Sequence, residues 1–281
     1  MIYDFHTDLI TCNNLTLQQK LQYINEANKI DTKMILALYI ATPITLQQIF
    51  ELLKPFQNTI LNNANYKHSP NEMPNIFSIE NVLFDESVKE SEIARLPFAI
   101  YGITWNYQNK YASGCLSMGG LSQTGKILID KLQEQNKIID LAHTNKESFF
   151  DIIDYTQTKS YKKVVCTHTC FKDIFNHPRN IDSEQIKTII DCNGIIGLTL
   201  VKDFLGGDTI DTIVKHIDYF CNKFDYKHLA IGTDYFGTKH LDCIDNYKKF
   251  ENLSRALSKF GYSNDVIKMI FYDNLNNYIK S

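Results

Sequence analysis

Eight short apolar runs, spaced along most of the chain, constrain the fold of this 281-residue sequence more than any other feature. Each run has the length of a strand and is rich in Ile, Val, Leu or aromatic residues. The runs lack polar alternation, which is typical of strands that are covered on both faces in a parallel sheet. They are Ile2–Phe5, Met34–Ala41, Ile76–Ile79, Phe98–Ile103, Ile138–Leu141, Val164–Cys166, Ile195–Leu200 and Leu229–Ile231.

Longer amphipathic segments separate most of these runs and are predicted to be helices. Strands that alternate with helices predict an α/β fold of the (β/α)8 TIM-barrel type, and one barrel of about 250 residues fits a single domain over residues 1–281. A doubly wound open sheet is the structural alternative, but the Gly-rich phosphate loop of many such folds is absent. The polar stretch 62–74 is expected to be a surface insertion. The predicted helices are Leu17–Asn28, Thr45–Leu61, Thr124–Gln135, Glu184–Cys192, Thr209–Lys223, Tyr247–Phe260 and Asn264–Ile279.

Composition narrows the class of protein. The formal net charge of −3 argues against nucleic-acid binding, which normally requires a basic face. Seven irregularly spaced cysteines without a C-x-x-C motif indicate free thiols in a reducing compartment. No signal peptide is evident, and no apolar run approaches the roughly 18 residues of a membrane span. We therefore expect a cytoplasmic protein with no nucleic-acid or membrane partner.

Polar residues that bind metals follow the apolar runs. In a barrel the C-terminal ends of all strands converge on one face, where catalytic groups lie. Three His and three carboxylates that converge there predict a metal centre, because neutral imidazole and carboxylate favour zinc and similar ions. The six residues are His6, Asp8, Glu80, His143, His168 and Asp234.

Each of these residues also has a purely structural interpretation when it is taken alone. A single His after a strand is more often a hydrogen-bonded core residue, a single Glu is more often exposed in a loop, and an Asp often caps a loop. Only their joint placement favours a metal centre. Asp140 precedes His143 and is a candidate to orient it.

An ordered set of short motifs runs from Asp4 to about Asn274. The motifs are Asp4-x-His6-x-Asp8-Leu9, Ser78-Ile79-Glu80, Ile103 to Asn109, Ile139 to His143, Thr167-His168, His177-Pro178-Arg179-Asn180, Gly232-Thr233-Asp234 and Asp273-Asn274-Leu275. In this order and spacing the sequence resembles the membrane (renal) dipeptidase family of zinc metallopeptidases, within the amidohydrolase superfamily. Each motif is weak by itself, and the ordered set is specific.

The resemblance implies two Zn²⁺ ions. His6 and Asp8 would bind one ion, His143 and His168 the other, and Glu80 would bridge them. The activity implied is hydrolysis of dipeptides or similar small substrates, including those with a C-terminal D-residue. Members of the family are often dimers, so a homodimer is a possible assembly.

The resemblance also implies roles around the metals. Asp234 would be the catalytic proton carrier, and Asn106 and Arg179 would contact the substrate, with Arg179 on its terminal carboxylate. The planar fork of an arginine suits a carboxylate.

The chain departs from the family pattern at several positions. Asn81 replaces a Gly, Phe5 replaces a smaller residue, and Phe236 replaces a second Asp after Asp234. These departures leave two alternatives open: another metal-dependent hydrolase of the superfamily, such as a phosphoesterase or lactamase-like enzyme, or a catalytically impaired metal-binding homologue. The H-x-D opening at His6 disfavours the phosphoesterases, which usually open with H-x-H.

Overall fold

The computed structural model describes residues 1–61, 77–161 and 163–281. Neighbouring strands pair in parallel, and their order, β1 to β8 in chain sequence, is that of a closed barrel. The predicted fold class is confirmed; Ile76 and the stretch 62–74 lie outside the described residues. The strands are β1 (Ile2–Thr7), β2 (Thr32–Tyr39), β3 (Phe77–Glu80), β4 (Ile100–Gly102), β5 (Ile138–Asp140), β6 (Val164–Thr169), β7 (Ile196–Leu198) and β8 (Leu229–Ile231).

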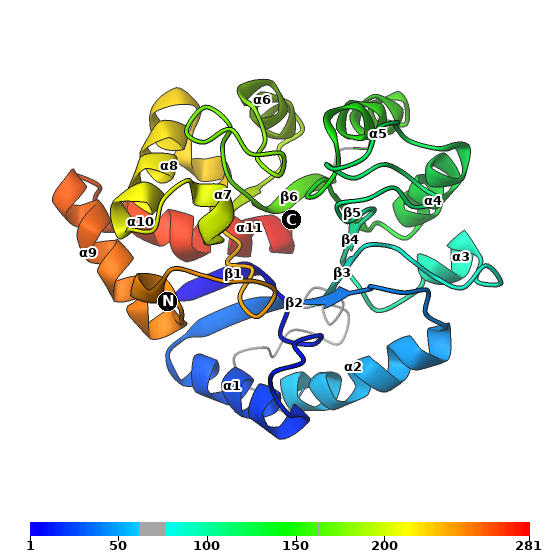
Figure 1. The fold of residues 1–281 in the computed structure, drawn as a ribbon, viewed down its shortest axis with the longest axis horizontal. Helices are drawn as coiled ribbons and strands as arrows, with labels where there is room; N and C mark the ends of the chain where they lie inside the picture. The colour runs from blue at the N-terminus through cyan, green and yellow to red at the C-terminus, as the bar shows by residue number, and fades with distance from the viewer. Residues whose placement is uncertain (62–76, 162) are drawn as a thin grey trace. The chain divides into compact units, whose positions relative to one another are not determined.

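Helices follow most strands, as Figure 1 shows. Two of them begin with a capping box, in which Thr16 or Asp182 pairs with a Gln three residues later. A π-helical turn, η6 (Met269–Asp273), separates the last two helices, which were predicted as one. The helices are α1 (Leu17–Lys29), α2 (Leu46–Leu61), α3 (Glu90–Ile93), α4 (Gln123–Glu134), α5 (Lys146–Thr158), α6 (Ser183–Asp191), α7 (Lys202–Leu205), α8 (Ile210–Lys223), α9 (Phe250–Phe260), α10 (Asn264–Lys268) and α11 (Asn274–Lys280). No helix among the described residues has the length and apolar character that crossing a membrane requires.

Helix α5 was not predicted, although the sequence contains its signals. Asn145 caps it by accepting a bond from the backbone of Ser148 at 2.7 Å. Its buried side chains at positions 149, 152, 153 and 156 follow the spacing of one helix face. The segment is rich in Phe, Ile and Tyr, which individually favour strands. Burial of these four side chains on one face of the helix outweighs the strand preference of the individual residues.

The chain divides into two compact units. The first comprises residues 1–35 and 166–281, and the second residues 36–165. Both divisions fall inside a strand, in β2 and in β6. The single domain predicted over 1–281 is not tested by this division and stays a prediction.

The first unit contains β1, β7, β8 and most of β6. Asp4 pairs with Ile231, and Gly197 pairs with Ala230. The carbonyl of Thr167 lies so close to β7 and β8 that a Cβ on Gly197 or on Gly232 would lie 1.9 Å from it. Glycine is therefore required at both positions, and the end of β6 packs closely against β7 and against the residue that follows β8. In the same unit α8 and α9 lie side by side (Figure 1).

The second unit contains β3, β4, β5 and the second half of β2. Its register places Tyr39 beside Glu80, Glu80 beside Gly102, and Gly102 beside Asp140. The carboxyl ends of these strands are therefore level, and polar residues that follow them lie in one row. Helices α3, α4 and α5 pack against one another in sequence in this unit (Figure 1).

His216 of α8 generates a prediction about pH and stability. It is fully buried, accepts a hydrogen bond from the backbone of Phe171 at 3.4 Å, and contacts the carbonyl of Leu205 at 3.1 Å. Burial lowers the pKa of His216 to about 4, from 6.5. Between pH 6.5 and about pH 4, His216 is therefore protonated in the unfolded chain but not in the folded chain. The free energy of unfolding falls as the pH falls through this range.

We expect His216 to remove about 2 kcal/mol of stability between pH 7 and pH 5. Urea unfolding at both pH values, for the wild type and for His216→Gln, measures this difference. Glutamine keeps a donor and an acceptor but does not titrate, so the variant should lose about 2 kcal/mol less than the wild type over the same range. Equal losses in the two proteins would show that His216 is not responsible.

Candidate metal centre

His6, Asp8 and Asp234 form one donor cluster in the first unit. Each offers one ligand atom, and these atoms all lie within 4.8 Å of one another. The Nε2 of His6 lies 3.6 Å from Oδ1 of Asp8. Two tetrahedral zinc ligands at 2.0–2.2 Å from the ion would lie roughly 3.3–3.6 Å apart, so this spacing fits a shared cation.

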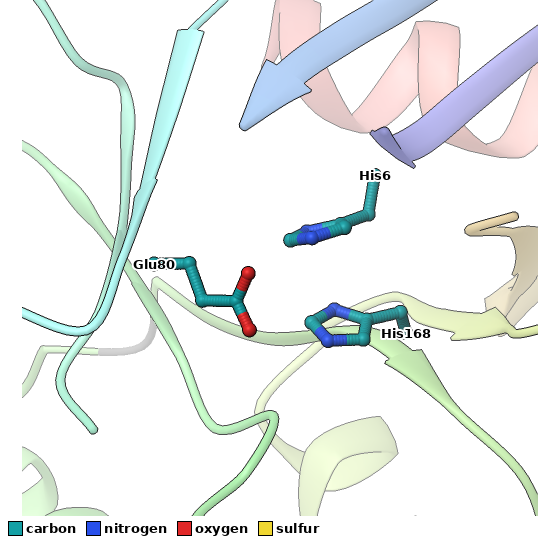
Figure 2. A group of neighbouring side chains, drawn as sticks. All are labelled: His6, Glu80 and His168. Carbon is teal, nitrogen blue, oxygen red and sulfur yellow. The ribbon is translucent and has the colours of Figure 1, made fainter. Parts of the chain in front are cut away.

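His168 lies against His6 in the same unit. Their ring centroids are 3.8 Å apart at an interplanar angle of 33°, and Figure 2 shows the two imidazoles side by side. The hydroxyl of Thr167 lies 2.8 Å from Nδ1 of His168 and 3.4 Å from Nδ1 of His6. A hydroxyl that accepts the Nδ1 proton leaves the lone pair on Nε2, the form that binds a metal.

Asp4 supports this cluster through hydrogen bonds of its side chain, a role that was not predicted from the sequence. Its carboxylate is fully buried and accepts bonds from the Thr233 backbone at 2.8 Å, the Thr233 hydroxyl at 2.6 Å, the Tyr247 hydroxyl at 2.5 Å and the His6 backbone at 3.2 Å. Desolvation raises the pKa of Asp4 to about 6, against the lowering effect of these hydrogen bonds. Asp4 thus ties the end of β1 to the turn that carries Asp234.

Backbone strain accompanies two of the predicted site residues. His143 has a φ of 68° and Asp234 a φ of 63°, in the left-handed region that non-glycine residues rarely adopt. The backbone of Asp234 donates to the carbonyl of His6 at 3.0 Å, which holds the strained turn in place. Strain of this kind persists only where surrounding contacts fix it, and it is concentrated at functional sites.

Glu80 and His143 form a second donor group, in the second unit. The carboxylate of Glu80, at the end of β3 (Figure 2), lies 2.7 Å from Nε2 of His143. Both residues are 6% exposed. The other ring nitrogen, Nδ1 of His143, lies 2.7 Å from Oδ1 of Asn106. Asp140 accepts a bond from the backbone of Ala142 at 3.0 Å, so it stabilises the turn that presents His143.

Arg179, the predicted carboxylate ligand, is buried next to His168. Its Nη2 donates to the carbonyl of His168 at 3.1 Å, and its guanidinium lies 5.4 Å from the ring centroid of Phe204. Its Nε has no hydrogen-bond partner among the described residues. Asn180 anchors the segment by donating to the carbonyls of Phe175 and Phe204, both at 2.8 Å.

Two departures from the family pattern are explained by the structure. Asn81 has a φ of 65°, a conformation that Gly and Asn tolerate best. Its amide donates to the carbonyl of Ile40 at 2.7 Å and accepts from Asn109 at 3.1 Å, so asparagine adds contacts that glycine lacks. Phe236 also has a positive φ, of 72°, and packs edge-on against Tyr23. Neither replacement removes a member of the donor groups.

The structure thus brings the predicted residues together within each unit. His6, Asp8, His168 and Asp234 are neighbours in the first unit. Glu80, His143 and Asn106 are neighbours in the second. The catalytic and substrate-binding roles assigned to Asp234, Asn106 and Arg179 stay predictions.

Parallel strands in barrel order that end in His and carboxylate groups define the class of a metal-dependent hydrolase. The chain belongs to the membrane dipeptidase family, peptidase family M19, whose model matches residues 59–280. Family membership confirms the predicted enzyme class, a hydrolase that acts on dipeptides. The matched range begins after His6 and Asp8, which lie beside His168 and Asp234 of that range in the structure.

Relatives and solved structures agree with this family. The chain is 29% identical over 188 residues to an uncharacterized protein of Klebsiella pneumoniae, covering 62% of this chain and 68% of that protein. It is 25% identical over 150 residues to an uncharacterized dipeptidase of Schizosaccharomyces pombe, covering 51% of this chain and 36% of that protein. The match to the second relative therefore spans well under half of that relative's length.

A metallo peptidase from Rhodobacter sphaeroides, solved with a phosphinate mimic of the dipeptide L-Ala-D-Ala, has the same fold. Its TM-score is 0.77 at 14% identity, and the match covers 99% of this chain and 98% of that one. At this identity the likeness shows the fold alone.

Gly237 generates a prediction about the donor cluster of the first unit. A Cβ at this position would lie 2.1 Å from Oδ2 of Asp8 and 2.6 Å from Oδ1 of Asp234. Gly237→Ala should therefore displace both carboxylates and weaken binding of a divalent cation by roughly 10–100-fold, the range for disturbed orientation of metal ligands. Competition with a chromophoric chelator measures the affinity.

Gly207→Ala is the matched control. Its Cβ would lie 2.5 Å from the hydroxyl of Thr212, a side chain outside both donor groups. This variant should bind metal like the wild type, and thermal melting of both variants should show a retained fold. Wild-type metal affinity in Gly237→Ala would contradict a cation site at Asp8 and Asp234.

Proposed function

We propose that the protein is a dinuclear zinc dipeptidase that hydrolyses short peptides with a free C-terminal carboxylate. The observation that carries the proposal is the presence of a buried His–carboxylate group in each unit, at the ends of barrel strands, in a chain of a dipeptidase family. His6 and Asp8 would bind one Zn²⁺, His143 and His168 the other, and Glu80 would bridge the two.

The donor set suits zinc. Imidazole nitrogen and carboxylate oxygen are both zinc ligands, and the spacing between His6 and Asp8 fits ligands of one ion. When bound, the metal pair would supply a nucleophilic water at neutral pH and polarise the peptide carbonyl. Thr167 would keep Nε2 of the first-unit histidines available, and Asp4 would hold the backbone that presents His6 and Asp234.

Asp234 would carry the proton in this reaction. It lies beside His6 and Asp8, and its strained turn fixes its carboxylate there. As a carboxylate it would take the proton from the attacking water and pass it to the departing amine nitrogen. A fixed carboxylate at this place would replace bulk water as the proton acceptor.

Arg179 would bind the terminal carboxylate of the substrate. Its buried guanidinium has an Nε–H with no hydrogen-bond partner among the described residues, and a carboxylate oxygen is the complementary acceptor. Recognition of a carboxylate next to the reacting amide restricts substrates to short peptides. The dipeptide mimic bound to the Rhodobacter sphaeroides enzyme contains a C-terminal D-Ala, which supports a test of D-residues here.

We also propose that the protein functions in a reducing compartment such as the cytoplasm. All seven cysteines are thiols that form no disulfide, which is the usual state of cysteines in a reducing environment. The possible homodimer stays a prediction.

The test of the function is metal content and peptide turnover, measured on one sample. We expect two zinc ions per chain and turnover of L-Ala-L-Ala and L-Ala-D-Ala that is lost with a chelator and restored with zinc. His143→Ala should bind one ion per chain and retain less than about 1% of the activity, because a ligand of one ion is lost. Two bound ions in His143→Ala would remove this residue from the ligand set, and a zinc-loaded wild type without turnover would favour an impaired homologue.

Arg179→Lys tests recognition of the substrate carboxylate. Lysine keeps the charge but loses the bidentate fork, so kcat/KM for a dipeptide should fall by about 10–100-fold, the value of a lost hydrogen bond between charged groups. The same dipeptide with a C-terminal amide is the control substrate, and its turnover should change little. Equal losses on the two substrates would exclude Arg179 from carboxylate binding.

A further inference from the structure

We propose that Tyr39, Trp105 and Tyr107, which we call the aromatic row, determine substrate specificity by packing against the side chain of the N-terminal residue of the peptide. The row would favour substrates in which this side chain is aromatic. The inference rests on the proposed function in one respect, that a peptide carbonyl reacts next to Glu80 and His143.

The aromatic row lies next to the donor group of the second unit. The ring centroid of Trp105 is 5.3 Å from that of Tyr39 and 5.9 Å from that of Tyr107. It is also 6.1 Å from the ring centroid of His143. Tyr39 ends β2, where the register places it beside Glu80. Centroid separations of roughly 4.5–7 Å are typical of aromatic rings in contact, so the row is continuous with the ring of a proposed metal ligand.

The aromatic row stays partly exposed. Tyr39 and Trp105 are half-buried, and Tyr107 is 59% exposed, whereas Tyr101 of β4 is fully buried. The segment 103–109, which carries two of the three rings, contains no charged residue. Accessible aromatic surface beside a few polar groups is typical of a site that binds a small molecule.

The backbone that carries Trp105 is held by the segment that returns beside it. The amide of Leu116 donates to the carbonyl of Asn106 at 2.8 Å. The amide of Gly114 donates to the carbonyl of Tyr107 at 3.3 Å. A Cβ on Gly114 would lie 1.8 Å from the carbonyl oxygen of Trp105, so the two segments are in close contact. A surface that is ordered in advance loses little conformational entropy when a ligand binds.

The N-terminal side chain is the part of a dipeptide that fits this position. In the proposed reaction the attacked carbonyl belongs to the N-terminal residue and lies beside Glu80 and His143. The side chain of that residue branches from the carbon bonded to this carbonyl. The terminal carboxylate is instead assigned to Arg179, which belongs to the first unit. Packing of an aromatic side chain against the row should be worth about 10-fold in affinity.

The test uses two dipeptide series with the zinc-loaded enzyme. In the first series Gly, Ala, Leu or Phe precedes a constant L-Ala, and in the second series the same residues follow a constant L-Ala. We expect kcat/KM to rise by about 10-fold from Ala to Phe in the first series and to change little in the second. The absence of this rise in the first series, or an equal rise in the second, would overturn the inference.

Variants of the row test which residues are responsible. Trp105→Ala and Tyr107→Ala should each lower the preference for Phe over Ala to about 3-fold or less, and Trp105→Phe should retain most of it. Phe260→Ala, which removes a ring of α9 that is 57% exposed, is the matched control and should keep the wild-type preference. Thermal melting shows whether each variant folds, and the exposed Tyr107 still tests the row if Trp105→Ala does not fold. A wild-type preference in folded Tyr107→Ala and Trp105→Phe→wild-type comparisons alike would overturn the role of the row.

Binding of phosphinate mimics separates this inference from the proposed function. Trp105 is the single tryptophan of the sequence, so tryptophan fluorescence reports a ligand that reaches the row. Two dipeptide phosphinates that differ only in a benzyl or a methyl group at the N-terminal side chain are titrated into the protein. We expect the benzyl ligand to bind about 10-fold more tightly and to change the emission of Trp105. Equal affinities in an enzyme that hydrolyses dipeptides would overturn the inference alone. Tighter binding of the benzyl ligand without turnover of any dipeptide would support the row and contradict the proposed function.

Discussion

The first-unit donor cluster depends on the buried carboxylate of Asp4. Its hydrogen bonds join the backbone of His6 to the backbone and side chain of Thr233, and thereby β1 to the turn after β8. Without such donors a buried carboxylate would cost several kcal/mol. Because hydrogen bonds are directional, the network restricts the relative position of the two strand ends. That position brings His6 and Asp8 next to Asp234. In the second unit, His143 is held by the contact of its ring with Asn106 and by the hydrogen bond of Asp140 to the turn before it.

The sequence predicted the strands well, and the same physical reason drew attention to the candidate donor residues. Strands that are buried on both faces are almost continuously apolar, so a polar residue at the end of such a run stands out in the sequence. In a barrel the C-terminal ends of all strands lie on one face, which brings together polar residues that are far apart in the chain. The supporting role of Asp4 was not predicted because Asp4 lies inside such a run and its hydrogen-bond partner, Thr233, is 229 positions away. The substrate-binding role predicted for Asn106 came from the resemblance, and its contact with Nδ1 of His143 could not be predicted because it depends on a loop geometry that no local pattern encodes.

The departures from the family pattern illustrate how a barrel tolerates change next to a metal site. Asn81 adopts the left-handed conformation that a glycine would adopt without strain, and its amide hydrogen bonds to Ile40 and Asn109 compensate part of that cost. Phe236 has no such polar compensation, and its ring instead packs on Tyr23. Both residues adopt a left-handed backbone conformation in their turns. That conformation helps to determine where the preceding residues, Glu80 and Tyr235, are placed.

The burial of Arg179 is the physical argument for its proposed role in substrate binding. A guanidinium that is 5% exposed has lost most of its hydration, and the carbonyl of His168 and the face of Phe204 replace only part of it. An unsatisfied buried donor costs about 1–3 kcal/mol, and more when it is charged. A core that needed only stability would replace such a residue by an apolar one. In the role proposed for Arg179 this cost would be recovered when a substrate carboxylate binds, and its planar donors would favour a carboxylate over a neutral amide.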